Sequence, residues 1–175
     1  MIGRDKSKAF SAIKERVGSK LHRWKEKLLS QAGKEVLLKV VAQSIPTIAM
    51  SCFLLPKGCC SELNKMMSNF LWGQRGSKHK MHWMGWKKMC KEKNLCGIGF
   101  RDLHLFNLAL LAKQGWKLLT GQSCLLFRVL KARYFPISTF LNAKLSSNAS
   151  YTWRSIRRTR EVLQLGFRWK IGNGS

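Results

Sequence analysis

Apolar residues recur along much of the chain at the spacing of an α-helix. Phe10, Ile13 and Val17 lie three and four residues apart, which places them on one face of a helix. A longer apolar stretch over residues 35–54 predicts a second, mostly buried helix. Pro46 falls inside this stretch, and we expect the helix to be kinked or split there because proline lacks a backbone N–H and clashes with the preceding turn.

The later periodic segments are each bounded by residues that favour a helix end. Ser, Thr and Asp side chains accept hydrogen bonds from the first free N–H groups of a helix, and Gly or Pro ends one. We therefore expect helices over residues 61–73 with Ser61 as N-cap, 102–121 with Asp102 as N-cap, 123–134 starting at Ser123, and 152–165 with Thr152 as N-cap. The predicted fold class is mainly α.

Two segments depart from the helical pattern. Residues near 74–100 are basic and interrupted by glycines, which predicts a short irregular or hairpin segment containing a short helix near 84–91. Residues 167–175 alternate apolar and basic side chains and then reach Asn-Gly, which favours a hairpin turn. We expect four regions: helical over 1–73, a basic Gly-rich connector over 74–101, helical again over 102–166, and a truncated hairpin over 167–175.

The net charge of the chain indicates which class of partner it binds. The chain has 33 Lys and Arg residues against 8 Asp and Glu, a net charge of +25, while 45% of its residues are hydrophobic. Such a chain can bury a core and still present a strongly positive exterior. Charge of this sign and size favours a polyanionic partner, and we expect RNA, DNA or an RNA–DNA hybrid.

Membrane insertion and secretion are not expected. The most apolar stretch, residues 40–55, is shorter than the roughly 20 residues of a spanning helix, and no apolar signal core follows the basic start. We expect a nuclear or cytoplasmic location with reduced cysteines. Cys52 and Cys124 are predicted to lie in the core, and Cys59 and Cys60 to pack together at a helix start.

No catalytic or cofactor motif stands out. The acidic residues are scattered, whereas two-metal phosphoryl transfer needs clustered carboxylates. Neither a GxxxxGKS phosphate loop nor a GxSxG elbow occurs. His79, His82, Cys90 and Cys96 are weak metal candidates, because their spacing matches no standard zinc pattern. We predict a protein without enzymatic activity, metal or cofactor.

Basic residues alternate with aromatic ones in several places. On a helix, Arg154, Arg157 and Arg158 share a face and can contact neighbouring phosphates. The tryptophans beside such clusters are expected to be core anchors, with stacking on exposed bases as the alternative. The predicted nucleic-acid contacts are Arg23, Lys25, Lys27, Lys87, Lys88, Arg154, Arg157 and Arg158.

Longer motifs follow one another in an order that resembles a known family. They read WKEKLLSQAGKEVLLK from Trp24, FLWG from Phe70, GIGFRDL from Gly97, ALLAKQGW from Ala109, WRSI from Trp153 and RWKIGNG from Arg168. Together they resemble the polyproteins of plant non-LTR (LINE-type) retrotransposons over nearly the whole chain.

This resemblance implies a position in the longer protein. The chain is similar to the thumb-like and connector region between the reverse-transcriptase palm and a zinc-binding module, a region that grips the template–primer. The family's catalytic aspartates belong to a YxDD-type motif that this sequence lacks. The resemblance thus implies a non-catalytic part that binds nucleic acid; alternatives are an inactive remnant, or a part that complements a reverse-transcriptase palm domain in trans.

Overall fold

A computed structural model describes residues 6–25, 27, 29–73, 81–121 and 124–166. The predicted fold class is confirmed, since the described residues are mainly helical and contain no β-strand. The segment 81–101, where a hairpin was one of two expectations, is irregular with two short helices. The C-terminal strand expected over 167–175 lies outside the described residues.

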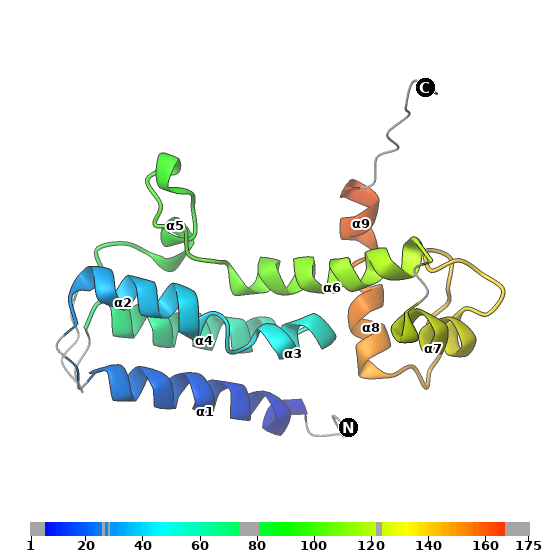
Figure 1. Cartoon of the computed structure of the whole chain (residues 1–175), viewed down its shortest axis with the longest axis horizontal. Helices are drawn as coiled ribbons and strands as arrows, with labels where there is room; N and C mark the ends of the chain where they lie inside the picture. Colours follow the sequence, from blue (N-terminus) through cyan, green and yellow to red (C-terminus); the bar gives the residue numbers. More distant parts are fainter. Residues whose placement is uncertain (1–5, 26, 28, 74–80, 122–123, 167–175) are drawn as a thin grey trace. The chain divides into compact units, whose positions relative to one another are not determined.

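The helices follow one another along the chain as shown in Figure 1. They are α1 (Lys6–Lys25), α2 (Gln31–Leu37), the π-helix η1 (Leu38–Ala42), α3 (Thr47–Cys52), α4 (Lys57–Leu71), α5 (Trp86–Met89), the 3-10 helix η2 (Lys93–Leu95), α6 (Leu103–Leu119), α7 (Leu125–Tyr134), α8 (Tyr151–Arg157) and α9 (Arg160–Gly166). They form two compact units. The first unit comprises residues 1–50 and 55–107, and the second comprises 51–54 and 108–175.

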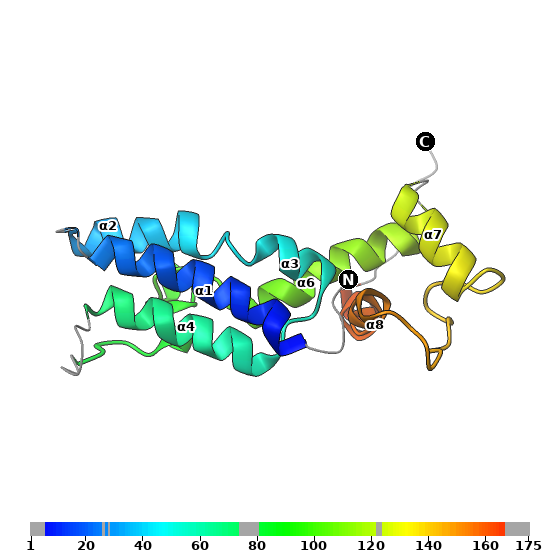
Figure 2. The ribbon, with the colours of Figure 1, turned by 90° about the horizontal axis from the view of Figure 1, so that it is seen from below.

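The core of the first unit lies between α1, α4 and the α2–η1 segment, which run alongside one another (Figure 2). The predicted stripe on α1 is largely correct, because Phe10 and Val17 are buried while Ile13 is half-buried. At the far end of α1 the ring of Trp24 lies 6.0 Å from that of Phe70 on α4. Burial of this apolar stripe fixes which side of α1 faces water.

Pro46 divides the second predicted helix, as expected. A turn precedes α3, which begins at Thr47, directly after the proline. The sequence did not predict the π-helix η1, in which the N–H of Gln43 donates to the carbonyl of Leu38 at 3.0 Å. Such π turns occur as short insertions in α-helices, and here one widens the helix just before the proline ends it.

The start of α4 differs from the prediction that Ser61 caps it. The helix begins at Lys57, with Pro56 in the N-cap position, so Ser61 lies within the helix and is exposed. Proline is tolerated at a helix start because its missing N–H is not needed there. Cys59 and Cys60 are both buried in the first turns of α4, which confirms the predicted packing pair.

Asp102 caps α6 as predicted. Its Oδ1 accepts hydrogen bonds from the N–H groups of His104 at 2.9 Å and Leu105 at 3.1 Å. These are two of the four N–H groups that a helix start leaves free. At the other end Gly121 has a φ of +66°, a left-handed conformation that glycine adopts at low cost and that stops the helix.

Trp153 is the centre of the second unit. Its ring is fully buried and stacks on Tyr134 and Phe135, at centroid distances of 4.8 and 5.5 Å. Phe140 meets the same ring edge-on at 5.9 Å. This aromatic cluster joins α7, α8 and the loop between them.

The last predicted helix, over 152–165, differs in both its start and its continuity. Ser150, rather than Thr152, is the N-cap of α8, because its Oγ accepts from the N–H of Trp153 at 3.3 Å. The helix then ends at Arg157 and α9 begins at Arg160. Thr159 lies at the break, buried, and its hydroxyl donates to the carbonyl of Ile156, a local bond that competes with helix continuation.

Cys52 and Cys124 were both predicted to lie in the core. Cys52 is exposed rather than in the core, because it lies at the end of α3 where the chain turns toward α4. Cys124 is half-buried and takes the N-cap position of α7, while Ser123, the predicted start, lies outside the described residues.

Candidate nucleic-acid interface

Most of the positive charge in the described part of the chain has no acidic partner within the protein. Two ion pairs form among these residues, Lys14 with Glu62 at 2.7 Å and Lys39 with Glu35 at 2.6 Å. Asp102 is used as a helix cap. The surplus charge of a sequence with 33 Lys and Arg residues therefore faces solvent, where phosphates can approach it.

The end of α1 carries the first group of predicted contacts. Arg23, Lys25 and Lys27 are all exposed, in the last turn of α1 or just after it. Trp24 lies between Arg23 and Lys25 in the sequence, and its packing against Phe70 anchors this end of α1. A shallow hollow of about 630 Å³ is lined by Arg23 together with Gly18, Ser19 and His22.

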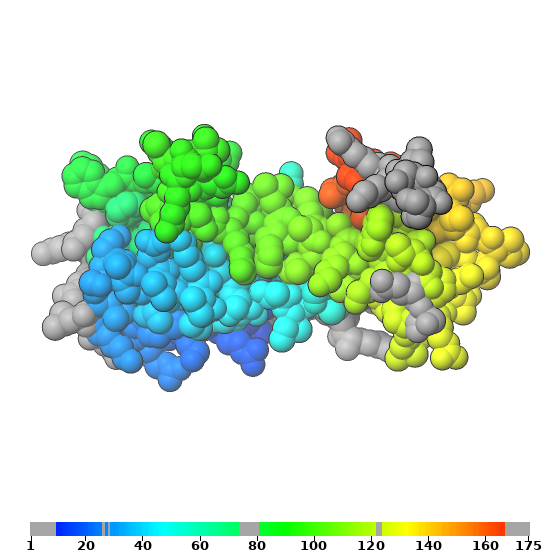
Figure 3. Space-filling view, turned by 45° about the horizontal axis from the view of Figure 1, so that its top comes forward, coloured from blue at the N-terminus to red at the C-terminus, as the bar shows by residue number. Residues whose placement is uncertain are grey.

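Lys87 and Lys88 form a second group on α5 and are exposed. Their helix is held by its other face: Met89 is fully buried, and the ring of Trp86 stacks on Phe100 at 5.1 Å. The α5 segment stands above α2 in Figure 1 and forms a raised part of the surface in Figure 3. Both lysines are therefore exposed on a short helix that Met89 and Trp86 hold against the protein.

The three predicted arginines of the second unit have partly structural surroundings. Arg154 is exposed, and its Nη2 donates to the carbonyl of Ser147 at 2.7 Å. Arg157 is half-buried, and its Nε donates to the carbonyl of Ala143 at 3.3 Å. Arg158, at the end of α8, is exposed. Each guanidinium has five N–H donors, so these bonds leave others for phosphate.

Arg160 belongs to the same basic cluster of the sequence but is not among the predicted contacts. Its Nη2 donates to the carbonyl of Ala143 at 2.7 Å and its guanidinium lies over the Phe140 ring at 5.3 Å. Burial, followed by the nearby charge of Arg157, lowers the pKa of Arg160. Arg157 and Arg160 thus hold the loop before α8 together, a role that only the folded chain reveals.

The metal candidates do not assemble into a site in the described part of the chain. No three His, Cys, Asp or Glu side chains there come close enough to hold a metal ion. His82 lies 3.4 Å from the hydroxyl of Ser68 and stacks on Trp72. Burial, with a smaller contribution from Asp102, raises the pKa of Cys90 to about 11, which disfavours the thiolate that zinc needs. His79 lies outside the described residues.

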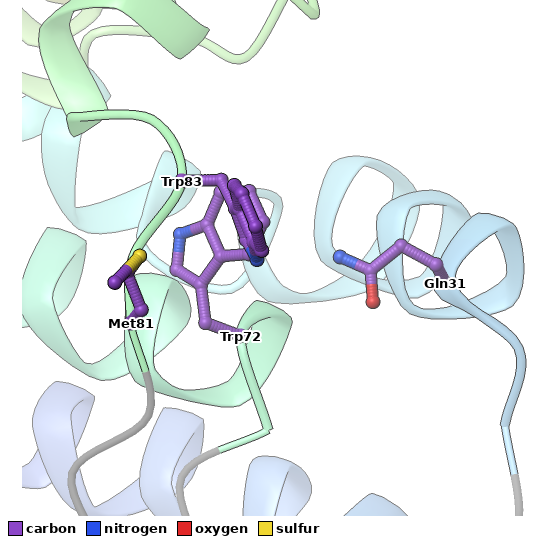
Figure 4. A pocket seen from close by; sticks show the side chains of 4 residues that line it. All are labelled: Gln31, Trp72, Met81 and Trp83. Carbon is purple, nitrogen blue, oxygen red and sulfur yellow. The ribbon is translucent and has the colours of Figure 1, made fainter.

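An aromatic cavity that the sequence did not predict lies in the first unit. It has a volume of about 580 Å³ and is lined by Gln31 at the start of α2, Trp72 after α4, Met81 and Trp83. Figure 4 shows the two indole rings beside each other, with the Gln31 amide directed toward them. The expectation that every tryptophan is a core anchor is wrong for Trp83, whose surface is 80% exposed.

The chain is similar to proteins of a plant. It is 43% identical over 132 residues to the "Uncharacterized mitochondrial protein AtMg00310" of Arabidopsis thaliana, covering 75% of this chain and 86% of the relative. It is 38% identical over 168 residues to the "Putative ribonuclease H protein At1g65750" of the same plant, covering 94% of this chain. Such relatives are typical of open reading frames derived from plant transposons.

The two relatives differ in how much of them the chain represents. It spans most of the first but 27% of the second. No protein-family profile and no solved structure matches the chain.

Within the described residues, no helix is both long and apolar enough to cross a membrane.

Proposed function

The chain belongs to the family of the uncharacterized mitochondrial protein AtMg00310 of Arabidopsis thaliana, and on that premise we propose that it binds RNA, DNA or an RNA–DNA hybrid through Lys and Arg contacts with phosphates. We assign it as the thumb-like and connector part of a LINE-type reverse transcriptase, without catalytic residues of its own. The motif order described above and the match to a much longer ribonuclease H-named protein support this assignment.

The observation that carries the proposal is the excess of exposed, unpaired positive charge. Two ion pairs account for two of the basic side chains in the described residues, while the predicted contacts on α1 and α5 are all exposed. Each phosphate neutralised by Lys or Arg releases condensed counterions, which makes such binding steeply salt-dependent.

The test is a titration of the full chain with labelled duplex, single strand and RNA–DNA hybrid, followed by fluorescence anisotropy at several salt concentrations. If about six to ten phosphates are contacted, affinity falls roughly 10³- to 10⁵-fold between 50 and 200 mM salt. Folded, monodisperse protein that binds none of the three at the lowest salt would overturn the proposal and favour an inactive remnant.

A pair of charge-matched variants tests the predicted positions on α1. Replacing Arg23, Lys25 and Lys27 by Ala removes three candidate phosphate contacts, and the slope of log affinity against log salt becomes shallower by about 2.7 on duplex. The control variant removes the same charge from three other exposed lysines of the first unit, Lys57, Lys65 and Lys93. Equal slopes for the two variants would mean that the α1 residues have no special part in binding.

A second candidate function is complementation of a reverse-transcriptase palm domain in trans. The observation that favours it is the exposure of three apolar side chains on the α2–η1–α3 segment: Val36, Val40 and Ile48 are 58%, 66% and 82% exposed. Contiguous exposed apolar surface is typical of a face that another domain covers. Polymerase activity that requires both the chain and a separate palm domain would support this candidate.

A further inference from the structure

We propose that the aromatic cavity formed by Gln31, Trp72, Met81 and Trp83 binds an unpaired base of a single-stranded nucleic acid, stacked on Trp83. The inference rests on the proposed function and deepens it: phosphate contacts alone do not distinguish paired from unpaired strands, whereas a base in this cavity must be free of its complement.

The size and lining of the cavity fit a planar aromatic ligand. It has a volume of about 580 Å³ and is open to solvent, since Met81 and Trp83 are both largely exposed. Two indoles and a thioether supply the flat, polarisable surface that bases stack on. Every base has such a face, so this surface selects unpaired bases without selecting a sequence.

The exposure of the lining residues is the main argument for a ligand. Trp83 is 80% exposed and Met81 is 73% exposed, although large apolar side chains are usually buried. Trp72, beside them, is half-buried and already stacked on His82. A base placed against Trp83 would extend this row of rings and cover apolar surface that now faces water.

A polar group on the cavity wall can bind the edge of the base. The Gln31 amide faces the indoles across the cavity in Figure 4, and an amide offers both a donor and an acceptor. The Nε1–H of Trp72 is buried and has no acceptor among the described residues. The indole N–H of Trp72 is shielded from solvent, so the Gln31 amide is the polar group that the edge of a base can contact.

Charge decides between nucleic acid and an apolar peptide as the occupant. Lys27 precedes Gln31 by four residues, and Lys87 and Lys88 follow Trp83 by four and five; all three lysines are exposed. The nearest acidic side chain in sequence on the α2 side, Glu35, is already paired with Lys39. Phosphates on either side of a bound base would be attracted to these lysines, whereas an uncharged peptide would not, although the exposed Glu92 offsets part of the charge on the α5 side.

The experiment compares two labelled probes with the full chain at one salt concentration: a short single strand without base pairing, and a duplex of the same length. Trp83→Ala is expected to weaken single-strand binding about 5- to 150-fold, the range for loss of one stacking contact. Duplex binding should stay within about twofold, since duplex affinity comes mainly from phosphates. Trp83→Phe, which keeps a stacking ring, should restore most of the single-strand affinity.

Trp116→Ala is the matched control, because Trp116 is also an exposed tryptophan, 44% exposed, but belongs to the second unit and does not line the cavity. Circular dichroism of each variant verifies the fold. If Trp83→Ala and Trp116→Ala affect single-strand binding equally, or if Trp83→Ala weakens binding of both probes alike, the cavity does not bind a base. Salt-dependent binding by the parent chain would still support the proposed function in that case. Failure of the parent chain to bind either probe would overturn both.

Discussion

Asn107 holds the start of α6 to the junction between α3 and α4, and its removal gives a well-defined test of the first unit. Its side chain is fully buried. Oδ1 accepts from the N–H of Leu55 at 2.8 Å, and Nδ2 donates to the carbonyl of Met50 at 2.7 Å. One amide therefore pairs with two backbone groups where the chain turns after α3, a place without helical hydrogen bonds to replace them.

The cost of removing the amide follows from these two bonds. Asn107→Ala leaves a buried donor at Leu55 and a buried acceptor at Met50 without this partner, at about 1–3 kcal/mol each. We therefore expect a loss of roughly 2–6 kcal/mol in the free energy of unfolding. Asn107→Leu restores side-chain volume but not the hydrogen bonds, and should be destabilised by a similar amount.

The assay is urea unfolding followed by circular dichroism, combined with hydrogen exchange of the Leu55 amide. Exchange at Leu55 should accelerate in both variants. Asn142→Ala is the control, because Asn142 is exposed in the loop before α8 and its substitution should change stability by less than about 0.5 kcal/mol. If Asn107→Leu is as stable as the parent chain, the two hydrogen bonds do not stabilise the junction and the reasoning is refuted.

Two further predictions use contrasts within the first unit. A Cβ on Gly97 would lie 2.0 Å from the carbonyl oxygen of Lys91, whereas one on Gly58 would meet nothing within 4 Å. Gly97→Ala should therefore lower the free energy of unfolding by about 1–3 kcal/mol, and Gly58→Ala, in a helix, should raise it by up to about 1 kcal/mol. Equal thermal melting temperatures of the two variants would contradict this. Burial raises the pKa of Cys60 to about 11, so at pH 8 only about a thousandth of this thiol is ionised. Alkylation read by mass spectrometry should modify the exposed Cys52 well before Cys60, whose rate should rise about tenfold per pH unit between 7 and 9; equal rates at pH 8 would refute the assigned burial.

The structure confirmed some of the local signals in the sequence and contradicted others. The cap at Asp102 and the split at Pro46 each depend on a few neighbouring residues, so they could be predicted from the sequence alone. Ser61 and Thr152 failed as caps because a better start was available just upstream, at Pro56 and Ser150. Several residues near a helix start can serve as a cap, and packing decides which one does.

Burial and long-range contacts could not be predicted in the same way. Trp83 and Trp153 have similar basic surroundings in the sequence, yet one is exposed and the other is fully buried. The difference depends on which elements fold over each ring. The same holds for the aromatic cavity, whose lining comes from residues 31, 72, 81 and 83. No periodicity or spacing links Gln31 to Trp83 before the chain has folded.

The scarcity of internal ion pairs has a consequence for how folding and binding respond to salt. With two ion pairs in the described residues and a net charge of +25, like charges repel one another within the folded protein. Added salt relieves this repulsion and favours the compact state, but it also competes with phosphates for the same side chains. Added salt therefore favours folding but opposes the binding of phosphates. Under the proposed function, a bound polyanion would neutralise the same surface, so binding would also stabilise the folded protein.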